Sequence, residues 1–319
     1  MSRVVVVGSF NLDHAWRSAR LPGRGETLSG EYACGPGGKG FNQATACARA
    51  GAGTAFVCAL GEDAGGALAR RLAADDRIAL HAASVAAATG SAGIFVDEAG
   101  ENSIVVAPGA NAALDADAVA RCADAFTGAR VVLAQLETPA AAALEAFAQA
   151  RAAGALAMLN PAPADAATSP ALLAACGLLT PNQTEFAALV ARHLDESIAA
   201  EAVATAADET LHTLCRRLLP HGRVVVTLGA AGCFASLPDS EHGDARWLRL
   251  PAAPARVRDS TGAGDAFNGA LAASLALDAA MPFAAHLRFA GRYAALSTER
   301  PGAAASMPRR AELAGRTAD

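Results

Sequence analysis

Short, almost purely apolar runs alternate with alanine-rich stretches along most of the chain. Strands that are buried on both faces typically have such continuous apolar sequences. The expected strands cover residues 4–8, 54–60, 131–136, 155–160, 178–180 and 224–228. The expected helices cover residues 42–50, 65–73, 140–153, 184–192 and 266–277. This alternation predicts an α/β protein in which helices cover both faces of a mainly parallel central sheet.

Two regions lack a helical period. Residues 14–34 and 91–107 alternate in polarity, and the second region has the pattern of a β-hairpin around residues 98–101. The two regions could form a small separate sheet that covers a cleft and excludes water from a reaction. They could equally be edge strands of the main sheet. Residues 195–212 are acidic and alanine-rich, and there we expect a solvated helix or an insertion around a turn.

Charge and cysteine content disfavour several classes of protein. The net charge is −5 and aromatic residues make up 5% of the chain, so we expect no nucleic-acid partner. No apolar stretch is long enough to span a membrane, and the N-terminal valine run lacks the pattern of a signal peptide. The seven cysteines are scattered and include no C-x-x-C pair. This disfavours disulfides and a zinc site, and it favours a cytoplasmic location.

One basic residue is unusual. Of the 26 basic residues all but one are arginine, and the only lysine is Lys39, within GGKG. A compact ammonium on a flexible stem differs physically from a planar guanidinium. The position therefore either requires a lysine for its chemistry or has kept one by chance.

The strongest local signal for chemistry is DSTGAGDAFNG, residues 259–269. Gly262 and Gly264 precede the predicted helix, so backbone N–H groups can converge at a helix N-terminus, where an anion such as a phosphate is favoured. Asp265 stands at the start of that helix. It could cap the helix, or it could take the proton from a substrate hydroxyl during phosphoryl transfer. The motifs described next favour the second role.

A second glycine-rich segment, GPGGKGFNQA, covers residues 35–44. It is not a Walker A loop, because a glycine follows the lysine, and no dinucleotide-binding fingerprint follows the first strand. Lys39 and Asn42 can donate hydrogen bonds to hydroxyl groups. Asn11 and Asp13 come just after the first strand, where ligands of open α/β sheets bind. Together they offer donors and acceptors for vicinal sugar hydroxyls.

In combination these motifs resemble one family. Seven segments follow one another in order from about residue 4 to about residue 308: GSFNLDH, GGKGFNQA, GENSIVVAPGANAAL, LNPAPA, TPNQTE, VTLGAAG and DSTGAGDAFNGAL. They are similar to the motifs of the PfkB carbohydrate kinase family. The resemblance implies one three-layer α/β/α domain over residues 1–319, with lid strands inserted at about 14–34 and 91–107. It also implies ATP-dependent phosphorylation of a small sugar, best matched by D-ribose at its 5-hydroxyl.

The resemblance assigns roles to individual residues. Asp265 would be the catalytic base, and Gly262, Ala263 and Gly264 would form the anion hole. The sugar would be bound by Asn11, Asp13, Gly38, Lys39, Asn42, Glu137 and Asp265. ATP would contact Asn182, Thr227, Leu228, Gly229, Gly232 and Gly264.

Two cations and an assembly are implied in the same way. Glu185 of the N-x-x-E motif would help to organise Mg²⁺, largely through water, which suits a cation that keeps much of its hydration shell. A monovalent cation such as K⁺ would lie beside the anion hole, surrounded mostly by backbone oxygens of Asp259, Thr261, Ser297, Arg300, Gly302 and Ser306. Members of the family often form homodimers through the lid, and the lid regions of this chain permit one.

Two positions depart from the family pattern. Phe41 replaces a small residue after GGKG, and it could either pack inward or reshape the sugar site. Gly291-Arg292-Tyr293 replaces an Asn-Ala-Ala-like stretch on the adenine side, which leaves an adenine contact in question. The substrate is therefore open between ribose and a deoxyribose, a fructose-like sugar, a keto-deoxy sugar acid or a nucleoside. A non-catalytic sugar sensor on the same fold is the alternative outside the enzymes.

Overall fold

The central sheet of this computed structural model has nine strands within residues 3–239 and 245–314, which are the residues that the structure describes. In spatial order the strands are β13 (Trp247–Leu250), β12 (Cys233–Ser236), β11 (Arg223–Thr227), β10 (Leu178–Leu179), β9 (Leu156–Leu159), β8 (Val131–Ala134), β1 (Val4–Val7), β4 (Thr54–Gly61) and β5 (Ala79–Val85). The strands from β11 to β5 are parallel, whereas β12 and β13 are antiparallel. The mainly parallel sheet is as predicted.

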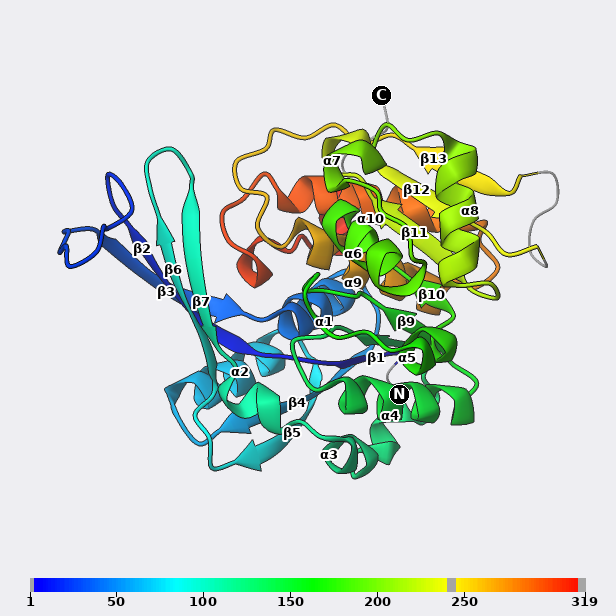
Figure 1. Ribbon diagram of the computed structural model, residues 1–319. Helices are drawn as coiled ribbons and strands as arrows, with labels where there is room; N and C mark the ends of the chain where they lie inside the picture. Colours follow the sequence, from blue (N-terminus) through cyan, green and yellow to red (C-terminus); the bar gives the residue numbers. More distant parts are fainter. Residues whose placement is uncertain (1–2, 240–244, 315–319) are drawn as a thin grey trace.

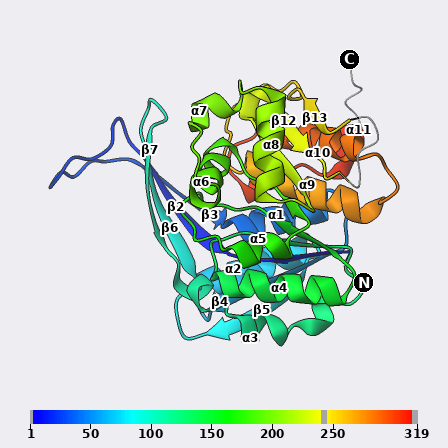
Figure 2. The ribbon, with the colours of Figure 1, turned by 45° about the vertical axis from the view of Figure 1, so that its right-hand side comes forward.

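The sequence of β1 explains the layers. Its four valines are buried, and because successive side chains of a strand point to opposite faces, Val5 and Val7 join one apolar cluster while Val4 and Val6 join another. The first cluster includes residues of α3 (Ala116–Ala120), α4 (Ala140–Ala152), α5 (Pro170–Ala175), α6 (Gln183–His193), α7 (Ala200–Val203) and α8 (Asp208–Leu218). The second includes residues of α1 (Lys39–Arg49), α2 (Ala64–Asp75), α9 (Ala263–Leu277), α10 (Phe283–Ser297) and α11 (Arg310–Ala314). The predicted three-layer α/β/α fold is confirmed (Figure 2).

A small second sheet stands out from the α/β body (Figure 1). Its strands, in spatial order, are β3 (Glu31–Gly37), β2 (Asn11–Arg17), β6 (Gly90–Val96) and β7 (Asn102–Ala107). We call this sheet the lid. The separate sheet expected from the polarity pattern is therefore present, and the alternative of edge strands of the main sheet is wrong. The register pairs Asn11 with both Gly37 and Gly90, so the base of the lid adjoins the chain that leaves β1.

The acidic segment 195–212 was expected to be solvated, and this is wrong for part of it. It forms α7 and the first turn of α8, in which Val203, Leu211 and His212 are buried. His212 Nδ1 lies 2.8 Å from Ser236 Oγ on β12. The acidic residues occupy exposed or half-buried positions, so they concealed the apolar positions that attach these helices to the sheet.

The remaining short elements are 3₁₀ turns, namely η1 (Gly109–Ala113), η2 (Ala123–Phe126), η3 (Gly229–Ala231) and η4 (Ala304–Ser306). Within the described part of the chain, no helix has the length and apolar character needed to cross a membrane.

Candidate active site

Asp265 lies in the first turn of α9, and only 7% of its surface is exposed. The helix begins at Gly262, which has a φ of 74°, and the carboxylate of Asp265 does not cap it. Instead, Asn42 Nδ2 donates to Asp265 Oδ2 at 2.8 Å, and Gln43 Nε2 donates to Oδ1 at 2.8 Å. Both donors come from the first turn of α1. The carboxylate therefore faces a neighbouring helix, and capping does not explain its presence.

The charges around Asp265 suit a proton acceptor. Burial raises the pKa of Asp265, and the Lys39 ammonium and the two amide hydrogen bonds offset this only in part. Burial by itself would lower the pKa of Lys39, but Asp265, Glu137 and Glu185 outweigh it and raise that pKa. Lys39 is therefore held in its charged form. A carboxylate with a raised pKa accepts a proton more readily than an exposed aspartate does.

The glycines before α1 let its first turn approach the backbone that follows β1. Gly38 has a φ of 85°, and a Cβ there would lie 2.8 Å from the backbone nitrogen of Asn11. A Cβ at Gly40 would lie 2.5 Å from the backbone nitrogen of Ser9. Side chains at these positions would push α1 away from β1. The glycines thus bring Lys39 and Asn42 to the base of the lid.

The residues predicted to bind the sugar gather at this place. Glu137, which follows β8, accepts hydrogen bonds at Oε2 from Ser9 Oγ at 2.5 Å and from the Lys39 N–H at 2.9 Å. Burial, together with the nearby charge of Glu137, raises the pKa of Asp13 to about 6. Asn42 Oδ1 is buried and has no hydrogen-bond partner among the described residues. An acceptor in that situation suits a ligand hydroxyl.

Asn11 is held in place by a residue that was not among the predicted sugar-binding residues. Asn111, in the turn after β7, donates from Nδ2 to Asn11 Oδ1 at 2.8 Å and to the Phe10 carbonyl at 3.0 Å. Its Oδ1 accepts from the Phe10 N–H at 3.0 Å. Asn111 therefore fixes the chain between β1 and the lid.

A cavity of about 180 Å³ joins the base to the predicted anion hole. Its walls are formed by Lys39, Asn160, Ala162, Thr180, Asn182, Glu185, Thr227, Ser260, Gly262, Ala263, Gly264, Asp265 and Asn268. The N-terminus of α9 opens into it, where unpaired N–H groups and the helix dipole favour an anion. A phosphate in this cavity would lie between the Lys39 ammonium and the backbone N–H groups of α9.

Three of the predicted ATP contacts are not in the cavity wall. Leu228 is buried, with 2% of its surface exposed, and Gly229 begins the η3 turn. A Cβ at Gly232 would lie 2.0 Å from the Leu250 carbonyl oxygen, so that glycine also serves the packing against β13. The roles of these three residues toward ATP stay predictions.

The N-x-x-E motif forms the start of α6 as a capping box. Glu185 Oε2 accepts from the Asn182 N–H at 2.8 Å, and Asn182 Oδ1 accepts from the Glu185 N–H at 2.8 Å. Asn182 Nδ2 also donates to Glu185 Oε1 at 3.0 Å. This reciprocal pairing satisfies helix N–H groups and fixes the carboxylate in the cavity wall, where a hydrated cation beside a phosphate could reach it.

The loops predicted to surround a monovalent cation are joined through Asp259. Its Oδ1 accepts from the N–H and the Oγ1 of Thr261 at 2.9 and 2.6 Å, and its Oδ2 accepts from the Gly302 N–H at 2.7 Å. Burial acts to raise the pKa of Asp259, but these hydrogen bonds outweigh it and lower that pKa. The Arg300 side chain forms an ion pair with Glu312.

The other two predicted cation residues, Ser297 and Ser306, are buried, and their hydroxyls donate to backbone carbonyls one turn earlier. Over residues 3–239 and 245–314, no group of three or more His, Cys, Asp or Glu side chains is placed to hold a metal ion.

The two segments that depart from the family pattern, Phe41 and residues 291–293, contribute to packing rather than to the cavity. Phe41 is buried, with its ring edge-on to Phe10 at 5.1 Å between centroids, so it packs inward. Tyr293 is fully buried, and Arg292 Nη2 donates to the Leu313 carbonyl at 3.1 Å. Gly291 has open space at its Cβ position. None of the three residues from 291 to 293 lines the cavity beside Asp265.

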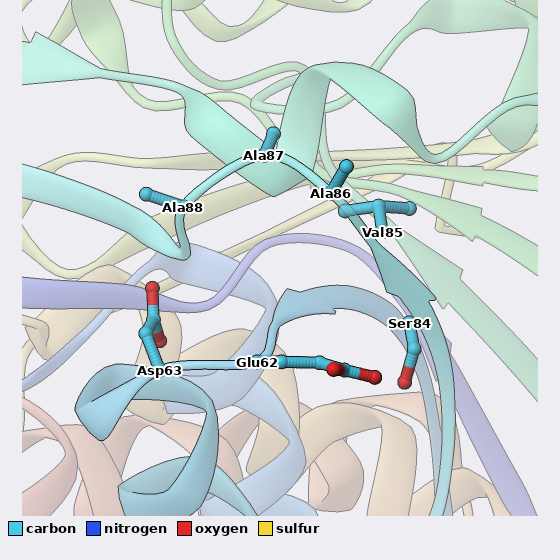
Figure 3. A pocket seen from close by; sticks show the side chains of 7 residues that line it. All are labelled: Glu62, Asp63, Ser84, Val85, Ala86, Ala87 and Ala88. Carbon is cyan, nitrogen blue, oxygen red and sulfur yellow. The ribbon is translucent and has the colours of Figure 1, made fainter.

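A second cavity, of about 500 Å³, lies at the ends of β4 and β5 (Figure 3). Figure 3 shows the Glu62 side chain extended toward Ser84. Asp63 has a structural task, because its Oδ1 accepts from the Gly66 N–H at the start of α2 and its Oδ2 accepts from the Thr89 N–H, both at 2.8 Å. The other lining residues are Val85 and three alanines. We assign no chemistry to this cavity.

Comparison with known proteins identifies the family. The sequence pattern of the pfkB family of carbohydrate kinases matches residues 1–310. The chain belongs to this family. As a pfkB carbohydrate kinase, it is a phosphotransferase that acts on a sugar hydroxyl.

Relatives within the family match the chain over nearly its whole length. Ribokinase from Mus musculus is 34% identical over 316 residues, which cover 97% of this chain and 93% of that protein. Ribokinase from Haemophilus influenzae is 35% identical and covers 97% and 96% of the two chains. A solved structure of Arabidopsis thaliana ribokinase with ribose and ATP has a TM-score of 0.84 at 30% identity, and 98% of both chains is covered.

The motifs alone did not identify several polar residues that the structure places in or beside the predicted sugar and phosphate sites. These are Ser9, Gln43, Asn111, Gln135, Asn160, Thr180 and Asn268, and all are buried. All but Gln135 lie inside a quoted motif, and Gln135 directly follows the apolar run of β8. A polar residue in such a position was the available signal, because buried polar groups need partners.

Proposed function

We propose that this pfkB carbohydrate kinase transfers the γ-phosphoryl group of ATP to the 5-hydroxyl of D-ribose. The proposal is supported by the identity of 34–35% with two ribokinases over nearly the whole chain and by the likeness to a ribokinase solved with ribose and ATP. The observation that carries the chemistry is the buried carboxylate of Asp265, beside the cavity of about 180 Å³ at the N-terminus of α9.

In the proposed reaction, Asp265 accepts the proton of the 5-hydroxyl as the hydroxyl oxygen forms a bond to the γ-phosphorus. The bond from that phosphorus to the bridging oxygen of ADP breaks. N–H groups of residues 262–264 and the Lys39 ammonium would stabilise negative charge on the phosphoryl oxygens. Asn11, Asp13, Gly38, Asn42 and Glu137 would orient the sugar, because their donors and acceptors suit adjacent hydroxyls.

Two cations fit the residues present. Glu185, held in the cavity wall by Asn182, would bind Mg²⁺ through water, and Mg²⁺ would neutralise part of the phosphate charge. The loops tied by Asp259 to Thr261 and Gly302 would hold K⁺ through backbone oxygens and so fix the anion-hole backbone. Asn182, Thr227 and the η3 turn would contact the rest of ATP.

The lid supports a proposed homodimer. Ile104, Val105 and Val106 on β7 are 51–69% exposed, and an exposed apolar strand of this kind is usually covered by a partner. We take the whole chain as one kinase domain whose lid would cover the sugar. A cytoplasmic location is also proposed, supported by seven free cysteines.

The test is a sugar panel with coupled ADP detection, with and without K⁺. Ribose should be the best substrate, and Asp265→Asn should lower kcat by about 10²–10⁴-fold, the usual contribution of a general base, while ribose binding measured by calorimetry is kept. Near-normal turnover of the folded variant would remove Asp265 as the base. A sugar phosphorylated better than ribose would replace ribose in the proposal, and unchanged rates when K⁺ is replaced by an inert organic cation would remove the monovalent site.

A further inference from the structure

Gln43 has no exposed surface, and its amide makes three hydrogen bonds to side chains. Its Nε2 donates to Asp265 Oδ1 at 2.8 Å and to Asn160 Oδ1 at 3.0 Å. Its Oε1 accepts from Gln135 Nε2 at 2.6 Å. The three partners come from α9 and from the segments that follow β8 and β9. Gln43 therefore lies between the ends of two neighbouring strands and the proposed catalytic base, Asp265.

The orientation of this amide is fixed by groups that can only accept hydrogen bonds. The Thr180 carbonyl accepts from Asn160 Nδ2 at 3.0 Å, so Asn160 must turn its oxygen toward Gln43. The ionised carboxylate of Asp265 also only accepts. Both neighbours therefore require the NH₂ group of Gln43, and its oxygen must find a donor elsewhere, which Gln135 supplies.

The same network returns to the anion hole. Thr180 Oγ1 donates to Asn268 Oδ1 at 2.5 Å, and Asn268 Nδ2 donates to the Gly264 carbonyl at 2.9 Å. Hydrogen bonds thus link the Asp265 carboxylate, through Gln43, Asn160, Thr180 and Asn268, to the Gly264 carbonyl. At Thr180 the connection passes through the residue itself, from its backbone carbonyl to its hydroxyl.

We propose that Gln43 is a positioning residue, which holds the Asp265 carboxylate in the orientation needed for proton transfer and couples it to the anion hole. This inference rests on the proposed function. Asn42 and Gln43 each donate to one carboxylate oxygen, so rotation of the carboxylate would break both hydrogen bonds. Asn42 belongs to the sugar site, whereas Gln43 holds the carboxylate from the protein interior.

A positioning role predicts a change in the pH profile that a packing role does not. The charged groups facing Asp265 are Lys39 on α1, Glu137 after β8 and Glu185 on α6, and substitutions at Gln43 leave all three in place. A hydrogen bond to a carboxylate favours its charged form and lowers its pKa. Loss of the Gln43 amide should therefore raise the pKa of Asp265 and move the acid limb of kcat/KM to higher pH.

The experiment compares Gln43→Met and Gln43→Glu with the wild type in pH profiles of kcat and KM, using ribose and ATP. Met keeps the length without the amide, and we expect its acid limb to move up by about one pH unit. We expect kcat to fall about tenfold or more, with the ribose KM changed less than threefold. Glu keeps the shape but adds a second carboxylate beside Asp265, so its acid limb should move further.

Thr45→Val is the matched control, since Thr45 is buried on the same helix and its hydroxyl has no hydrogen-bond partner among the described residues. Its pH profile should be that of the wild type. If Gln43→Met does not fold, the pH profile of Gln43→Glu alone tests the positioning role. A folded Gln43 variant with an unmoved acid limb, or a control with the same shift, would overturn the positioning role. A wild type without sugar kinase activity would instead overturn the proposed function.

Discussion

Asp13 and Asp265 are carboxylates of one site with different surroundings. Two amides and Lys39 stabilise the Asp265 anion but offset the effect of burial only in part, so the pKa of Asp265 is also raised. Asp13 is raised to a pKa of about 6 by burial and by the charge of Glu137. At neutral pH Asp13 is therefore an anion held at a cost in folding free energy. Binding sites commonly carry such a cost, because the same side chain is needed by the ligand.

Asp13→Asn should stabilise the protein at pH 7. The folded-state pKa of Asp13 is about 6, against an ordinary value of 3.8, so the folded protein binds this proton more tightly than the unfolded chain. The wild type should therefore lose stability as the pH rises from about 4 to about 6, and the variant should not. We expect a gain of about 3 kcal/mol at pH 7, which disappears near pH 4, together with a large rise in the ribose KM. Urea unfolding across this pH range measures the gain, and equal stability of the two proteins at every pH would contradict it.

At the scale of elements, the contact between α1 and α9 sets the site, since it joins Asn42 and Gln43 to Asp265. Gly269 of α9 lies against α1 so closely that a Cβ would be 2.5 Å from both the Ala46 Cβ and the Gln43 carbonyl oxygen. A glycine inside a helix normally costs stability relative to alanine. Here the close approach of the two helices requires it.

Gly269→Ala should therefore destabilise the protein by about 1–3 kcal/mol, the usual cost of overpacking, and lower kcat by displacing Asp265. Gly291→Ala is the matched control within a helix, because its Cβ would meet open space. It should instead stabilise the protein by about 0.5–1 kcal/mol through helix propensity. Thermal unfolding of the two variants measures both effects. Opposite signs are expected, and a stabilised Gly269→Ala would show that the helices can separate without cost.

The helices and strands were largely predictable from the sequence, whereas the side-chain contacts between them were not. Runs such as the four valines of β1 are buried on both faces, and a continuous apolar sequence indicates this directly. The strands of the lid were predictable because polar and apolar residues alternate along them. The prediction that residues 195–212 are solvated was partly wrong, because the acidic composition of the segment as a whole does not separate the exposed face of its helices from the buried face. Gln43 and Asn160 are 117 positions apart in the sequence, and no local pattern tells which buried amides will meet.

At the scale of the whole molecule, the lid has two apolar faces. Ile104 and Val106 share the face of Asp13, because Val106 pairs with Ala92, which pairs with Asp13. Val105 lies on the opposite face, with Trp16, Tyr32 and Phe95. A partner packed on the first face would bury apolar surface and enclose the sugar at the same time.

The double variant Ile104→Lys, Val106→Lys should therefore convert the proposed dimer to a monomer and raise the ribose KM. Buried charges at an interface strongly oppose association. Val105→Lys, on the other face, is the control and should leave both properties unchanged. Light scattering after size-exclusion chromatography measures the oligomeric state, and steady-state kinetics measure the ribose KM. A monomeric wild type would contradict the dimer, and a dimer lost only in the control would place the interface on the other face.

Lys39 gives the protein a practical property. It carries the only side-chain amine in the chain. Lys39 lies in the cavity wall with Asp265 and Glu185, and the charges of Asp265, Glu137 and Glu185 raise its pKa. An amine-specific reagent can therefore modify only Lys39 and the N-terminus. Only the neutral amine reacts, and the raised pKa of Lys39 keeps it protonated at neutral pH, so labelling at Lys39 requires alkaline conditions. The fraction of protein modified at Lys39 would report how much of the site is covered, without any need for turnover.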